Sequence, residues 1–152
     1  MAGENKMSGG MVWLFALGAI VLAELGGYLT AGMGSKISAG VFFGVFAVCG
    51  FLGMFLTRAK TGIGVLAFIL ASIGSAIVFY VMVTSLFAGA ATEAANAAAA
   101  GQTETAVTEA AGATLGAAVG LFAGIIVLLG ALVAGITGCV AGAKFRGKLA
   151  SA

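Results

Sequence analysis

The sequence contains no histidine and no proline, and it has few charged residues. Without histidine, the chain has no imidazole to act as a general base or to bind a metal or haem. Without proline, no helix has a proline break, which disfavours the discontinuous helices of many secondary transporters. Charged residues are 8% of the 152 residues, whereas soluble domains have about 25%. The net charge of +2 gives no basic surface for nucleic acid.

Apolar residues dominate the composition instead. They make up 62% of the chain, and its mean hydropathy is +1.21. A helix needs about 20 apolar residues, with a range of about 17–25, to cross a bilayer. Four stretches meet this requirement: residues 11–33, 39–56, 61–88 and 114–143. We therefore predict an all-α integral membrane bundle of four transmembrane helices, forming a single domain over residues 1–152 with the lipid bilayer as its solvent.

The connections between these stretches differ in kind. Residues 34–38 and 57–60 are short turns, so the helices that they join should be antiparallel neighbours. Residues 89–113 are polar but rich in alanine, which is the best helix former. The third and fourth helices should therefore continue as a helical hairpin that turns at Gly101-Gln102, and a flexible loop is the alternative.

Basic residues predict the orientation in the membrane. Four spans place six of the seven on one side, together with both termini. These six are Lys6, Arg58, Lys60, Lys144, Arg146 and Lys148. The positive-inside rule then puts both termini on the cytoplasmic or equivalent side of a bacterial inner membrane or an organelle membrane. Lys6 and the following apolar run also resemble a signal peptide, but the apolar character continues to Met33, which favours a retained helix.

Small residues recur at every fourth position in all four stretches. Lipid tails are as apolar as leucine, so helices in a bilayer associate through close packing, which small residues permit. The predicted packing positions are Ala19, Ala23, Gly27, Ala31, Gly40, Gly44, Ala67, Ala71, Ser75, Gly112, Gly116, Gly120 and Gly124. They could pack the four helices together, or the row on the fourth helix could pack against another copy or another subunit.

Glu24 is the residue with the most chemical potential. It lies near the middle of the first apolar stretch, where a charge costs at least about 2.5 kcal/mol, so such residues usually face the bundle interior. Tyr28, one turn later, is the hydrogen-bond partner that local spacing places nearby. Other partners in the third stretch are Ser72, Ser75, Tyr80 and Thr84. Glu24 and Tyr28 could form a proton or cation site, or Glu24 could be a neutral acid that joins two helices.

Other chemistry is not evident from the sequence. Cys49 and Cys139 lie within apolar runs and are interpreted as small core residues. We find no metal-binding spacing, no nucleophile with a base, and no phosphate-binding loop between a strand and a helix. We therefore expect no enzyme activity and no cofactor.

Two segments resemble known families. Residues 18–30, GAIVLAELGGYLT, resemble the first helix of small multidrug resistance transporters, which implies a proton and cation site at Glu24 in a dual-topology dimer. The glycine-proline and tryptophan features of that family's later helices are absent. Residues 27–50, GYLTAGMGSKISAGVFFGVFAVCG, resemble the transmembrane protein 14 family in the spacing of their small residues. This resemblance implies export of porphyrin or fatty acid. The acidic 89–113 segment is foreign to that family, and we assign the chain to neither.

Two functions follow from these observations. The first is a non-catalytic structural or accessory subunit that packs through glycine and alanine, within a larger membrane assembly or with copies of itself. The alternative is a small proton- or cation-coupled transporter or channel that uses Glu24.

Overall fold

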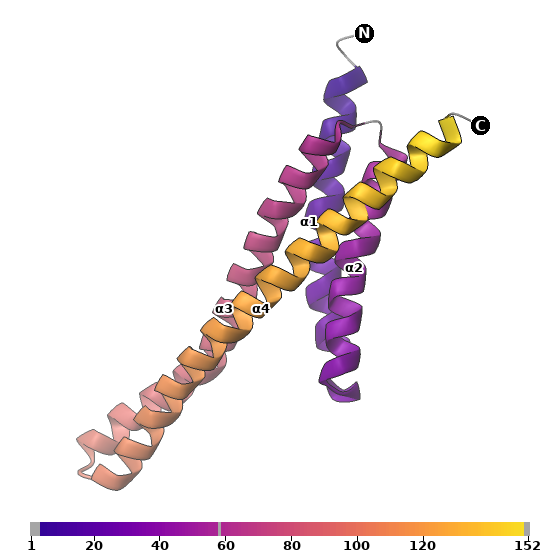
Figure 1. Cartoon of the computed structure of the whole chain (residues 1–152). Coiled ribbons are helices and arrows are strands. Elements are labelled where there is room, and N and C mark those ends of the chain that lie inside the picture. The colour runs from indigo at the N-terminus through magenta and orange to yellow at the C-terminus, as the bar shows by residue number, and fades with distance from the viewer. Residues whose placement is uncertain (1–3, 58, 151–152) are drawn as a thin grey trace. The chain divides into compact units, whose positions relative to one another are not determined.

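The computed structural model describes residues 4–57 and 59–150, and these residues are almost entirely helical (Figure 1). The elements are α1 (Glu4–Thr30), η1 (Ala31–Met33), α2 (Ser35–Leu56), α3 (Thr61–Ala99) and α4 (Thr103–Ala150). No strand occurs in this part of the chain. Each α-helix contains a segment long and apolar enough to cross a membrane. The prediction of an all-α fold with four such helices is confirmed.

The helices are divided between two compact units. Unit 1 consists of Met1–Ser75 and Leu128–Ala152, and unit 2 consists of Ala76–Val127. Unit 1 therefore holds α1, α2, the first part of α3 and the last part of α4. Unit 2 holds the remaining parts of α3 and α4, which run side by side as an antiparallel hairpin (Figure 1).

The turn of the hairpin in unit 2 has a specific backbone geometry. The Gly101 amide donates to the Ala98 carbonyl at 3.1 Å, and the Gln102 amide donates to the Ala97 carbonyl at 2.9 Å. This pair of hydrogen bonds is the Schellman motif, in which glycine takes the left-handed conformation. Gly101 has a φ of 75°, which other residues rarely adopt. The helical hairpin and its turn at Gly101-Gln102 are thus as predicted, and the flexible loop is not formed.

The first connection is shorter than predicted. Residues 34–38 were expected to form the turn, but α2 begins at Ser35 and only Gly34 separates it from η1. Gly34 has a φ of 105°, a backbone conformation that favours glycine, and together with η1 it connects α1 to α2. Its carbonyl accepts hydrogen bonds from the amides of Ile37 and Ser38, which starts the helix. Polar residues at 35, 36 and 38 suggested a loop, whereas they form the first turn of α2.

In unit 1, α2 and α4 approach each other through glycine. A Cβ atom at Gly138 would collide with the carbonyl oxygen of Ala47, and one at Gly142 would collide with the carbonyl oxygen of Phe51. At Gly50 a Cβ atom would lie 2.7 Å from the carbonyl oxygen of Gly135. The two backbones therefore touch directly, and only hydrogen on the α-carbon fits between them. Such short carbon-to-carbonyl approaches recur at closely packed helix interfaces.

Larger side chains fill the centre of unit 1 around this contact. Phe46, Met54 and Phe68 are fully buried, and the rings of Phe46 and Phe68 lie 6.5 Å apart, edge to face. Aromatic pairs favour this arrangement. The side chain of Cys139 is also buried, and neither it nor Cys49 forms a disulfide.

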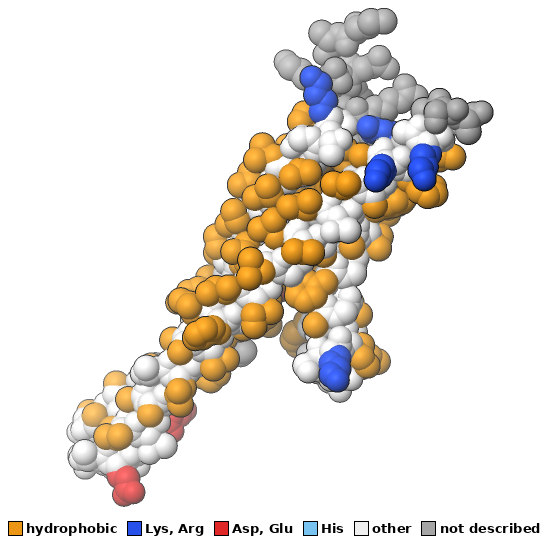
Figure 2. All heavy atoms as spheres, in the orientation of Figure 1, with side chains coloured by type: hydrophobic (Ala, Val, Ile, Leu, Met, Phe, Trp, Pro, Cys, Tyr) orange, Lys and Arg blue, Asp and Glu red, His pale blue; other side chains and the backbone are white. Residues whose placement is uncertain are grey.

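The outer surfaces of the helices are strongly apolar. Many leucine, valine and isoleucine side chains on all four helices are exposed, which would be unfavourable in water but is expected where lipid covers them. Figure 2 shows these apolar side chains along both units, with acidic side chains at the tip of the unit 2 hairpin. The distribution agrees with a membrane protein whose hairpin tip is polar.

The α2–α4 contact predicts a specific sensitivity to side-chain size. Gly138→Ala should lower the free energy of unfolding by about 1–3 kcal/mol, because the added methyl meets the Ala47 backbone and cannot move aside. Gly40→Ala is the matched control, since no neighbouring atom lies within 4 Å of its Cβ position. Denaturant titration in mixed micelles measures both. Equal stability of the two variants would contradict the proposed packing.

Candidate functional site

A polar pair in unit 1 is formed by Glu24 of α1 and Ser75 of α3. The Ser75 hydroxyl donates a hydrogen bond of 2.7 Å to Oε1 of Glu24. The Ser75 side chain is fully buried, and Glu24 is partly buried next to Ala23, which is fully buried. Glu24 lies six residues before Thr30, where its span ends, or about 9 Å along the helix. The bond therefore joins two helices inside the apolar segment.

Ser75 differs from most other hydroxyl side chains in the spans. Ser72 donates to the Phe68 carbonyl at 2.8 Å, and Thr30 donates to the Gly26 carbonyl at 2.7 Å. In both cases the acceptor is one turn earlier in the same helix, which is the usual arrangement for serine and threonine in helices. Among the hydrogen-bond partners predicted for Glu24, Ser75 is the one that bonds to it in the structure. Tyr28 is 69% exposed and is not part of the pair.

The chemistry available to this pair is narrow. A carboxyl group next to a hydroxyl can accept or release a proton, and the bond to Ser75 would change with its protonation. A hard cation such as calcium is bound by about six or more oxygen ligands. One carboxyl group and one hydroxyl group supply too few oxygen atoms for such a site. Among the described residues, no group of three or more histidine, cysteine or acidic side chains could hold a metal ion.

A second polar contact lies at the end of α2, again within unit 1. Nη1 of Arg146, on α4, donates to the carbonyl oxygen of Met54 at 3.0 Å and also to the carbonyl oxygen of Thr57. The last carbonyl groups of a helix lack partners within the helix. The Thr57 amide and hydroxyl both bond to the Gly53 carbonyl. Arg146 and Thr57 thus satisfy three carbonyl groups at this helix end, those of Gly53, Met54 and Thr57, and Arg146 ties α4 to α2.

The predicted packing residues fall into distinct groups. In unit 1, Ala19, Ala23, Ala67, Ala71 and Ser75 are buried, and Gly27 lies against Phe42. The side chain of Ala31 lies outside the described part of the structure.

In unit 2, three glycines of α4 face α3. Gly116 lies against Phe87, Gly120 against Val83, and the Cβ position of Gly124 is 3.9 Å from the carbonyl oxygen of Ala76. By contrast, Gly40, Gly44 and Gly112 have no neighbouring heavy atom within 4 Å of their Cβ positions. The Cβ positions of these three glycines are therefore open, and no close contact with another described helix depends on the absence of their side chains.

Several glycines of α4 that contact other helices of unit 1 were not predicted. Gly135, Gly138 and Gly142 of α4 lie against α2 or α3, yet they were not among the predicted packing positions. Gly138 and Gly142 have the same four-residue spacing as the predicted row, so a signal was present. Arg146 was counted only as a charge, since its partners lie about ninety residues earlier in the chain.

The chain was compared with known proteins. No protein-family model, no curated protein and no solved structure matches it. The resemblances of residues 18–30 and 27–50 to two transporter or export families therefore receive no support from the comparisons.

The Glu24–Ser75 bond predicts an energetic coupling between α1 and α3. A double-mutant cycle with Glu24→Ala and Ser75→Ala should give about 0.6 kcal/mol, and at most about 1.7, as for other hydrogen bonds between membrane helices. Ser72→Ala is the control, because Ser72 is buried nearby but bonds within its own helix. Coupling of Glu24 to Ser72 as strong as to Ser75 would argue against the pair.

The Arg146 contact makes a separate prediction. Arg146→Met should destabilise the protein by about 1–3 kcal/mol, because it leaves the carbonyl groups of Met54 and Thr57 without their donor. Lys144→Met, on an exposed residue of the same helix, should have little effect. Thermal unfolding followed by circular dichroism in detergent compares them. The assignment fails if both variants melt like the unmodified protein.

Proposed function

We propose that this chain is a non-catalytic structural or accessory subunit of a membrane assembly. The observation that carries the proposal is the direct backbone contact between α2 and α4 at Gly138 and Gly142. A transport pathway needs helices that separate or that enclose polar groups. These two helices touch without an intervening side chain, which favours a fixed scaffold.

The polar part of unit 2 supports a role in assembly. Glu93, Asn96, Gln102 and Glu104 are exposed around the hairpin turn. The two helices that form the hairpin are long: α3 extends over 39 residues and α4 over 48, which correspond to about 58 and 72 Å of helix. A bilayer core is only about 30 Å thick, so an ordered polar tip can reach beyond the lipid and meet a partner. The acidic side chains favour a partner with a basic surface.

The charges also support an orientation. Lys60, Lys144 and Lys148 are exposed at one end of unit 1, where α2 and α4 are joined by Arg146. Arg58 and the side chain of Lys6 lie outside the described residues. By the positive-inside rule this end faces the cytoplasm or its equivalent. The hairpin, between the third and fourth spans, would then face the opposite side of a bacterial inner membrane or an organelle membrane.

A second function is favoured by one observation. The Glu24–Ser75 hydrogen bond joins α1 to α3, so a change in the protonation of Glu24 would alter a contact between helices. A small proton- or cation-coupled transporter or channel could use such a change. This alternative needs a polar path to Glu24, whereas an open groove between α1 and α2 in unit 1 is lined almost entirely by apolar side chains.

Co-purification in mild detergent tests the subunit proposal. A partner should be present in fixed stoichiometry and should be lost from Glu93→Lys/Glu104→Lys, because charge reversal repels a basic surface. Lys36→Glu, an exposed charge reversal in unit 1, is the control and should keep the partner.

Glu24→Gln separates the two functions. It should leave a structural subunit assembled and active, whereas it should abolish proton-coupled flux in reconstituted vesicles. A partner-free protein with flux that depends on Glu24 would refute the subunit role.

A further inference from the structure

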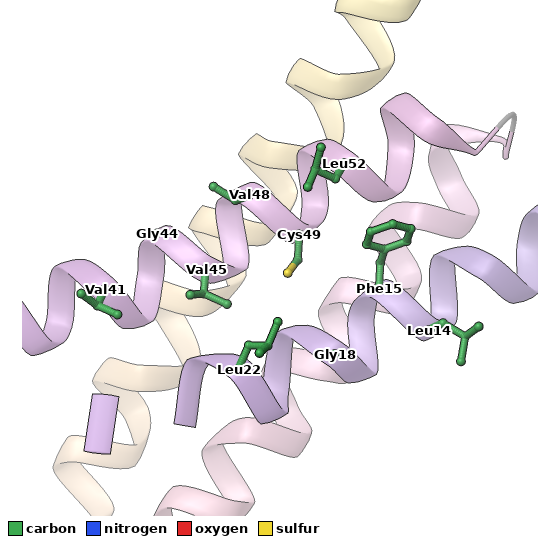
Figure 3. Close-up of a pocket in the computed structure, with 10 residues that line it drawn as sticks. All are labelled: Leu14, Phe15, Gly18, Leu22, Val41, Gly44, Val45, Val48, Cys49 and Leu52. Atoms are coloured by element: carbon green, nitrogen blue, oxygen red, sulfur yellow. The ribbon is translucent and has the colours of Figure 1, made fainter. Parts of the chain in front are cut away.

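An open groove runs along the interface of α1 and α2 in unit 1. It has a volume of about 680 Å³. Figure 3 shows side chains from both helices around it; they include Leu14 and Leu22 of α1, and Val48 and Leu52 of α2. The lining offers no charged side chain and no hydroxyl group. Leu14, Leu22 and Val48 are more than half exposed, so the groove opens sideways towards the surrounding medium.

Two glycines create the hollow. Gly18 and Gly44 line the groove, and no neighbouring heavy atom lies within 4 Å of the Cβ position of either residue. The space that their missing side chains leave is therefore not filled by the rest of the described chain. At a neighbouring pair of glycines the corresponding space is filled. The Cβ position of Gly26 lies against Val41, and that of Gly27 lies against Phe42.

The groove has a defined length, because α1 and α2 meet at both of its ends. At one end, the Cβ position of Gly53 lies 3.2 Å from Cβ of Phe15. At the other end, the Cβ position of Gly26 lies 3.0 Å from Cγ1 of Val41, and Ser38 donates to the Gly27 carbonyl at 2.9 Å. The lining extends over residues 14–22 of α1 and 41–52 of α2, or about 12 and 17 Å.

The groove is about as long as one leaflet is deep; it begins four residues before the end of α2 and extends past the middle of that helix. The hydrocarbon core is about 30 Å thick, so one leaflet contributes about 15 Å. A single hydrocarbon chain, which is narrow, flexible and apolar, fits both the extent and the lining.

Exposed basic residues lie at the end of unit 1 that is nearer to Leu52. Leu52 is four residues before the end of α2, and Arg146 joins that end to the basic C-terminal part of α4. Lys60 and Lys144 are exposed at this end of unit 1. A lipid whose chain lies in the groove would thus have its head group near positive charge, which favours an anionic head group.

We propose that the α1–α2 groove binds an acyl chain of an anionic phospholipid from the leaflet at the basic end of unit 1. Gly18 and Gly44 provide the space for the chain, and Lys60 and Lys144 attract the head group. This inference depends on residence in a membrane but not on the subunit role, so either can fail alone.

Spin-labelled lipid tests the proposal with the full-length protein. The chain is reconstituted into phosphatidylcholine vesicles that contain a small fraction of phosphatidylglycerol labelled on its acyl chain. The electron paramagnetic resonance spectrum should show a motionally restricted component. Gly18→Leu/Gly44→Leu should lower the restricted fraction below that of the unmodified chain, since leucine fills the groove without meeting another described atom within 4 Å of its Cβ.

A matched control variant separates groove filling from a general effect of leucine. Gly10→Leu/Gly40→Leu has the same two additions on the same helices, at open positions that do not line the groove, and it should keep the restricted component. Circular dichroism checks that both variants are folded; if the filled variant is misfolded, Gly44→Val provides the same test with a smaller side chain.

The preference for an anionic head group is measured separately. Labelled phosphatidylcholine should show a smaller restricted component than labelled phosphatidylglycerol, and Lys60→Gln/Lys144→Gln should abolish the difference. The proposal is overturned if the filled and control variants retain equal restricted components. It is also overturned if the filled variant changes only the oligomeric state, because a second copy would then be the occupant.

Discussion

The contact on which unit 1 depends is the direct approach of the α2 and α4 backbones at Gly138 and Gly142. In water, helices associate because apolar surface is removed from solvent. Lipid gives no such gain, so the attraction must come from close contacts between atoms. Glycine opposite the carbonyl groups of Ala47 and Phe51 allows these contacts. The large side chains of Phe46, Met54 and Phe68 then pack around a separation that glycine has set.

Polar contacts have a more limited role in the same unit. The bond between Glu24 and Ser75 joins α1 to α3, and Arg146 satisfies carbonyl groups at the end of α2. Hydrogen bonds between membrane helices contribute only about 0.6 kcal/mol on average, because the separated helices also find partners. They fix which faces meet, whereas packing provides most of the attraction. Where no second helix approaches, as at Gly18 and Gly44, the absence of a glycine side chain instead leaves a hollow.

Much of the fold could be predicted because its signals are local. The length of the apolar stretches predicted the four helices. The alanine-rich composition of residues 89–113 and the presence of Gly101 predicted the hairpin and its turn. The start of α2 was misplaced because serine and lysine occur in loops and in first helical turns alike. Spacing identified small residues but not the faces that meet, so Gly40 and Gly44 were grouped with buried residues while Gly138 and Gly142 were missed. Ser75 was one of several partners for Glu24, since only the three-dimensional packing brings residues fifty positions apart together.

The direct contact between the α2 and α4 backbones at Gly138 and Gly142 can be observed in lipid. Solid-state nuclear magnetic resonance on the unmodified chain in lipid measures this directly, through magnetisation transfer from the Ala47 carbonyl carbon to the Gly138 α-carbon. A cross-peak at short mixing time, with a second between Phe51 and Gly142, is the predicted result. Absence of both peaks, with peaks from neighbouring residues of the same helices intact, would contradict the account.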